Sequence, residues 1–190
     1  MRKLVCGVGI NDADYVVKRV INGKEVSCPY YARWKNMLTR CYSKDYSKKH
    51  KSYEECVVCE DWLTFSKFKA WMEKQIWMGK QLDKDILIVG NKLYCPDHCV
   101  FVDKNVNLFL TDSAKMRGNF PIGVCFSKRA GKFKATCNDG QGNTTNLGEF
   151  NTPDEAHKCW KYHKLSLAHK LADEQTDLRV AEALRVRYIN

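Results

Sequence analysis

In the first part of the chain, two segments have apolar residues at helical spacing. Apolar side chains recur every three or four residues between Tyr30 and Cys41, which predicts an amphipathic helix. An aromatic stripe from Trp62 to Met72 predicts a second helix, with its rings in the core. Residues 43–53 are polar and lysine-rich, which predicts an exposed loop. Earlier still, Asn22-Gly23 is a turn sequence and predicts a short hairpin.

The pattern changes after residue 82, where short apolar runs alternate with turn residues. Residues 82–110 read as a strand, a turn at Gly90-Asn91, a second strand and a short helix, which is a ββα order. Three short strands are then predicted at Ile122–Lys128, Lys132–Cys137 and Asn146–Phe150, with tight turns between them.

Two helices are predicted after these strands. Thr152 is a suitable N-cap, Pro153 suits the first helical position, and Glu155 follows the cap by three residues. A last helix carries Val180 and Leu184, and its partner is left open between the core, a second copy and DNA. The expected fold is therefore α+β, with one domain at residues 1–117 and a second at residues 118–190.

The charge of the chain favours a polyanionic partner. Its 190 residues include 32 Lys and Arg against 22 Asp and Glu, a formal net charge of +10. Nucleic acid is the first candidate, because no long apolar run or lipidation motif supports a membrane. The N-terminus lacks a signal-peptide pattern, so we expect a cytoplasmic protein.

Basic residues gather on two predicted elements. The alternation of the middle strand places Lys132, Lys134 and Thr136 on the face opposite Phe133 and Ala135. Lysines there can contact phosphates, and Arg129 or Thr136 can reach base edges. The alternative is a solvated face that binds nothing. Further expected DNA contacts are the turn residues Lys128 and Arg129, and the first-helix residues Arg33, Lys35 and Arg40.

The strands and helix of the second domain carry a family resemblance. The pattern runs through Gly123-Val124, Gly131-Lys132-Phe133-Lys134-Ala135, Leu147-Gly148-Glu149-Phe150 and a helix with Ala156 and Trp160. It resembles the AP2 DNA-binding domain. That resemblance implies a three-stranded antiparallel sheet that lies in the DNA major groove and is packed on a helix.

The first domain resembles another family. Its pattern comprises Tyr31, Trp34, Arg40-Cys41, Cys59-Glu60-Asp61-Trp62, Leu82-Asp83-Lys84-Asp85, Gly90-Asn91, Tyr94-Cys95-Pro96-Asp97-His98-Cys99, Phe101-Val102 and Asn107. It looks like the HNH homing endonucleases of bacteriophages, whose ββα unit binds a catalytic metal. A phage origin would place the protein in the host cytoplasm.

The HNH resemblance implies roles for four residues. Asp83 and Asn107 match the oxygen ligands of a Mg²⁺ or Mn²⁺ ion. Lys84 stands where the family has the His that activates water. A lysine with an ordinary pKa of about 10.4 is charged at neutral pH, so it suits a phosphate contact better than proton abstraction. His98 and Asp85 are the alternative bases, and an imidazole is chemically suited to proton transfer near neutral pH.

The chain has ten cysteines, which in the cytosol are expected to be thiols or metal ligands. Cys56 and Cys59 form a Cys-x-x-Cys pair, and with Cys41 and Cys99 they can make a tetrahedral Zn²⁺ site. Buried free thiols are the alternative.

The sequence thus predicts a sequence-selective protein that binds double-stranded DNA and resembles a phage HNH homing endonuclease. Metal-dependent cleavage or nicking depends on a replacement for the missing base. The alternatives are an inactive nuclease derivative that acts as a repressor or interference factor, and a decoy that binds an acidic protein. The sequence does not predict the oligomeric state.

Overall fold

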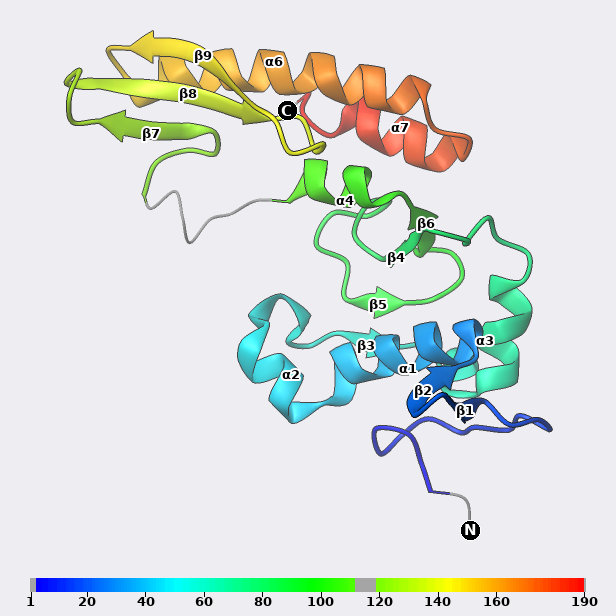
Figure 1. Ribbon diagram of the computed structural model, residues 1–190. Coiled ribbons are helices and arrows are strands. Elements are labelled where there is room, and N and C mark those ends of the chain that lie inside the picture. The colour runs from blue at the N-terminus through cyan, green and yellow to red at the C-terminus, as the bar shows by residue number, and fades with distance from the viewer. Residues whose placement is uncertain (1–2, 112–118, 190) are drawn as a thin grey trace. The chain divides into compact units, whose positions relative to one another are not determined.

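Residues 3–111 and 119–189 are described by the computed structural model, which is a mixed α+β fold, as predicted (Figure 1). The chain divides into an N-terminal unit, Met1–Phe101, and a C-terminal unit, Val102–Asn190. The predicted boundary between residues 117 and 118 lies outside the described residues. The two divisions differ in where they assign helix α4 (Lys104–Leu110), which the structure groups with the C-terminal unit.

The N-terminal unit begins with the predicted hairpin. Strands β1 (Lys18–Ile21) and β2 (Lys24–Ser27) pair antiparallel. At its tip, Asn22 and Gly23 have φ angles of 51° and 75°, the left-handed conformations that a two-residue type I′ turn requires. The Asn-Gly signal is thus confirmed.

The core of this unit forms around the two predicted helical segments. Helix α1 (Pro29–Tyr42) packs against a 3₁₀ turn, η2 (Glu60–Leu63), and helix α3 (Phe65–Met72). The Trp34 indole nitrogen donates to the Trp62 carbonyl oxygen at 2.7 Å inside this core. The aromatic stripe is confirmed as core, since Trp62, Phe65, Phe68 and Met72 are all buried.

The loop predicted for residues 43–53 was wrong. The segment forms helix α2 (Lys44–Lys49) and a 3₁₀ turn, η1 (Lys51–Tyr53). The Tyr46 ring stacks on His50 at 4.4 Å between centroids and meets Tyr53 at 5.6 Å. These ring contacts within the segment order a stretch that is otherwise lysine-rich and polar.

The ββα segment has the predicted order but a different strand pairing. Strand β4 (Gln81–Asp83) pairs with β6 (Val100–Val102), and α4 follows β6. Between them, β5 (Leu93–Tyr94) pairs in parallel with β3 (Val57–Val58). The turn at Gly90-Asn91 therefore does not close a hairpin between β4 and β5.

The C-terminal unit contains the predicted three-stranded antiparallel sheet, in the order β7 (Val124–Ser127), β8 (Lys132–Asn138), β9 (Thr144–Phe150). Helix α6 (Pro153–Asp173) runs along one face of this sheet, and α7 (Leu178–Val186) packs against α6 (Figure 1). The start of α6 is confirmed, because Thr152 and Glu155 form a reciprocal capping box.

Helix α6 buries a line of mostly small and aromatic residues against the sheet. Gly123 has a φ of 82°, and a Cβ atom there would overlap the indole ring of Trp160. Lys164 lies in the same line and is only 4% exposed. Its Nζ donates to the Asn138 carbonyl oxygen at 2.9 Å and lies 3.4 Å from the centroid of the Phe109 ring. The helical pattern of apolar positions did not predict this buried lysine.

Candidate nucleic-acid interface

The strand β8 has one face against α6 and one face away from it. Ala135 and Cys137 are buried in the core between sheet and helix, and Phe133 packs beside them. Lys132, Lys134 and Thr136 alternate with these residues and therefore occupy the opposite face of the strand. The predicted division of side chains along β8 is confirmed.

The neighbouring strands extend this surface, which we call the open face. Lys134 lies between Cys125 on β7 and Glu149 on β9, Ser127 is level with Lys132, and Asn146 is level with Thr136. Cys125, Asn146 and Glu149 are exposed. The position of Glu149 opposite Lys134 was not predictable from the sequence, because a β-bulge between Ala135 and Thr136 shifts the register with β9 and leaves Leu147 turned to the core.

Two further cations lie at one end of the open face. Lys128 and Arg129 are exposed in the turn between β7 and β8, where the Ala130 amide donates to the Ser127 hydroxyl at 3.4 Å. Together with Lys132 and Lys134 they give four cations, against the single carboxylate of Glu149 among the residues named for this surface. The surface is thus positive and rich in hydrogen-bonding side chains.

The basic residues of α1 belong to the N-terminal unit, whereas the open face belongs to the C-terminal unit. Arg40 places its guanidinium 5.5 Å from the centroid of the Tyr53 ring. Lys35 lies near Glu25 of the hairpin, and its charge helps to lower the pKa of that carboxyl group after the larger effect of Lys18. Arg33 is half-buried. Each of the three lies on α1, as predicted, and two have partners within the unit.

The Asp83-Lys84-Asp85 segment is a tightly bonded turn. Asp83 Oδ1 accepts hydrogen bonds from the amides of Asp85 and Ile86, both at 2.7 Å. Burial raises the pKa of the Asp83 carboxyl group, although the two amide hydrogen bonds act in the opposite direction. Asp83 thus fixes the start of the turn with one of its two oxygens.

Lys84 is enclosed within the same turn. Its side chain is 4% exposed, and its Nζ donates to both carboxylate oxygens of Asp85 at 2.7 Å and to the Asn91 carbonyl oxygen at 2.6 Å. An ammonium group has three donors, and three oxygens surround this one. This geometry assigns Lys84 to the structure of the turn. It leaves the ammonium without a donor for a phosphate, and Asp85 is held as its counter-ion.

His98 and Asn107 lie on either side of the boundary between the units. His98, between β5 and β6, is half-buried, and its Nδ1 is enclosed without a hydrogen-bond partner. Asn107 lies on α4, as predicted, and its backbone carbonyl accepts from the Thr111 hydroxyl at 2.9 Å. Asp83 therefore belongs to the N-terminal unit and Asn107 to the C-terminal unit. Their joint binding of a metal ion stays a prediction.

The predicted metal ligands do not form a group in the described residues. Over residues 3–111 and 119–189, no set of three or more His, Cys, Asp or Glu side chains is arranged to hold an ion. All ten cysteines are free. Burial raises the pKa of the Cys41 thiol to about 12 and also raises the pKa values of Cys56, Cys59 and Cys99. These four residues are thus neutral thiols at neutral pH in this structure, while Zn²⁺, Mg²⁺ and Mn²⁺ stay predictions.

Comparison with known proteins identified no relative of this chain. No protein-family model matches the chain, and neither a curated protein nor a solved structure matches it at a significant level. Among the described helices, none combines the length and apolar character that a bilayer span requires.

Proposed function

We propose that this chain is a site-selective double-stranded DNA-binding protein, and that the open face of its three-stranded sheet contacts the DNA. The observation that carries the proposal is the composition of that face. Lys132 and Lys134 lie beside Thr136, Asn146 and Glu149, with Lys128 and Arg129 at the end of the sheet. A surface with four cations suits a polyanion, and the chain as a whole has a net charge of +10.

The dimensions and chemistry of the sheet suit the major groove. Three strands spaced about 4.8 Å apart span about 10 Å between the outer strands, and the groove is about 12 Å wide. Lysines at the surface would contact phosphates, which sets affinity. Thr136, Asn146 and Glu149 offer hydroxyl, amide and carboxylate groups, and a carboxylate accepts a hydrogen bond from cytosine N4. This combination favours binding at selected sites, and it agrees with the resemblance to AP2 domains.

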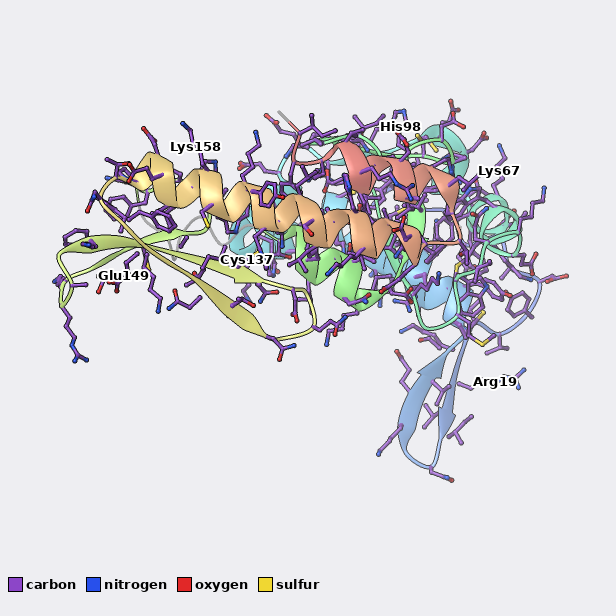
Figure 2. All side chains as sticks on the ribbon, turned by 90° about the horizontal axis from the view of Figure 1, so that it is seen from above. Arg19, Lys67, His98, Cys137, Glu149 and Lys158 are labelled. Atoms are coloured by element: carbon purple, nitrogen blue, oxygen red, sulfur yellow. The ribbon has the colours of Figure 1, made fainter. Side chains whose placement is uncertain are left out.

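Changing both Lys132 and Lys134 to Ala is expected to weaken binding at every salt concentration. The probe is a fluorescent duplex enriched from a random pool by the wild-type protein. If both lysines contact phosphates, the slope of log affinity against log salt falls by about 2. The double change K158A and K170A is the charge-matched control, since both lysines are exposed on α6 (Figure 2 labels Lys158). An unchanged slope in K132A/K134A would remove the open face from the interface.

A second candidate function is metal-dependent nicking of the bound DNA. His98 favours it, because its enclosed Nδ1 has no hydrogen-bond partner and an imidazole can accept a proton near neutral pH. The resemblance to HNH endonucleases makes Asp83 the expected ligand of the ion. Lys84 plays no part in this candidate, since its ammonium is bound within the turn.

The nicking candidate predicts separate losses of cleavage and binding. In Mg²⁺ or Mn²⁺, the wild type should nick a supercoiled plasmid that carries the enriched site. H98A should lower the nicking rate about a hundredfold or more, the range for loss of a general base. D83A should abolish nicking, while both variants still bind the duplex in EDTA. Binding by the wild type without nicking in any metal would instead indicate a non-catalytic repressor or interference factor.

A further inference from the structure

The β1–β2 hairpin leaves apolar side chains in solvent. Val20, Ile21 and Val26 are 74%, 52% and 48% exposed. Figure 2 shows the hairpin, labelled at Arg19, standing out from the rest of the N-terminal unit. A two-stranded hairpin is only marginally stable in water without a surface to pack on. The exposed residues therefore suggest a partner that covers the hairpin.

The two faces of the hairpin differ in charge. The register places Lys18, Val20, Glu25 and Ser27 on one face, and Arg19, Ile21, Lys24 and Val26 on the other. On the first face, Lys18 Nζ lies 2.5 Å from Glu25 Oε1, so these two charges cancel. The second face, which we call the outer face, has two cations, no carboxylate and two apolar side chains.

We propose that the outer face of this hairpin enters a groove of duplex DNA and forms a second DNA contact, separate from the open face of the sheet. The inference rests on the proposed function. Arg19 and Lys24 sit at diagonal positions of the outer face and would contact phosphates or guanine edges. Ile21 and Val26 sit at the other diagonal and would contact thymine methyl groups or sugars.

The size of the hairpin fits this occupant. Its two strands of four residues are each about 13 Å long and about 5 Å apart. A two-stranded ribbon of that width enters a major groove of about 12 Å. The Asn22-Gly23 turn keeps the tip narrow, because the turn itself contains only two residues.

The base of the hairpin is anchored, which lowers the entropy lost on binding. The Cys28 amide donates to the Val17 carbonyl oxygen at 2.8 Å, and Tyr15 Oη lies 3.6 Å from Cys28 Sγ. Pro29 then begins α1 directly. A hairpin held at its base by a hydrogen bond and a helix loses less freedom on binding than an unstructured arm.

The test uses the full chain and the same enriched duplex. R19A/K24A is expected to weaken binding roughly tenfold at 150 mM salt and to lower the salt slope by about 2, if both side chains contact phosphates. I21S/V26S is expected to weaken binding with no change of slope, since it removes no charge. K158A/K170A again controls for the loss of two charges. Circular dichroism checks that each variant is folded.

The outcomes separate this inference from the proposed function. Wild-type protein that binds no duplex would overturn both. Normal affinity and slope in R19A/K24A, together with a loss in K132A/K134A, would overturn the hairpin contact alone. If sedimentation shows a wild-type dimer that I21S/V26S converts to a monomer, the hairpin is covered by a second copy, which also overturns the inference. Losses in both hairpin variants, without a change of oligomeric state, would support it.

Discussion

Replacing Gly123 with alanine is expected to destabilise the C-terminal unit strongly while the stability of the core around Trp34 is unchanged. The new Cβ would overlap the Trp160 ring, and a φ of 82° is strained for any residue with a Cβ. The overlap and the strain together should cost about 2–5 kcal/mol. That is a large part of the 5–15 kcal/mol that stabilises a typical domain.

Fluorine NMR of protein labelled with 5-fluorotryptophan can measure this effect unit by unit. The chain has five tryptophans, and Trp160 is the one in the C-terminal unit, while Trp34, Trp62, Trp71 and Trp77 lie in the N-terminal unit. In G123A, the Trp160 resonance should move to its unfolded position at a lower denaturant concentration than in the wild type.

A matched control comes from the turn between β7 and β8. Gly131 also has a positive φ, 62°, but an added Cβ there meets no atom within 4 Å. G131A should therefore cost only the backbone strain, about 1–2 kcal/mol. If G123A unfolded at the same denaturant concentration as the wild type, the packing of α6 on the sheet would be wrong. If G123A still bound DNA normally at a denaturant concentration where its Trp160 resonance is unfolded, the open face would be excluded as the interface.

The second large effect concerns Lys164, whose replacement by methionine is expected to remove a pH dependence of stability. Burial lowers the pKa of Lys164 from 10.5 to about 8. Between about pH 8 and 10.5 the unfolded chain holds a proton that the folded chain has released, so folding becomes more favourable as the pH rises. Below pH 8 both states are protonated, and the full cost of burying the charge, on the order of 3 kcal/mol, is present.

The difference in unfolding free energy between wild type and K164M measures this effect. Urea unfolding, followed by the Trp160 fluorine resonance, should show that the wild type gains stability relative to K164M from pH 8 to pH 10.5. K158M is the control, because Lys158 is exposed on the same helix. A constant difference between wild type and K164M over this range would mean that Lys164 keeps an ordinary pKa in the folded chain.

The features that sequence predicted correctly are those with local causes. The Asn22-Gly23 turn needs only the conformational freedom of its own residues, and the capping box at Thr152 needs only a partner three residues away. Alternation along β8 likewise follows from the geometry of one strand. Non-local contacts were not predictable in this way. The pairing of β5 with β3 depends on residues far apart in the chain. Helix α2 was missed for another reason, because its composition is polar and lysine-rich although its ring contacts are local.

Charged residues show the same limit at the candidate site. Sequence placed Lys84 where the resembled family has a catalytic base, but it could not show that Asp85 and Asn91 enclose the ammonium. Nor could it show that Glu149 is level with Lys134, because that register depends on a bulge in the neighbouring strand. Lysines are usually exposed, so the residue type alone predicts a surface position. Only the three-dimensional structure shows that a particular lysine is buried.

The parallel pairing of β3 with β5 also sets an order of events during translation. Val57 and Val58 leave the ribosome well before their partners Leu93 and Tyr94 are synthesised. Until then, the growing chain must hold this apolar segment without the strand that covers it, and long-range parallel pairing is slow to form. The N-terminal unit can complete its fold only after Tyr94 has emerged, so Val58 stays unpaired while the residues between the two strands are synthesised.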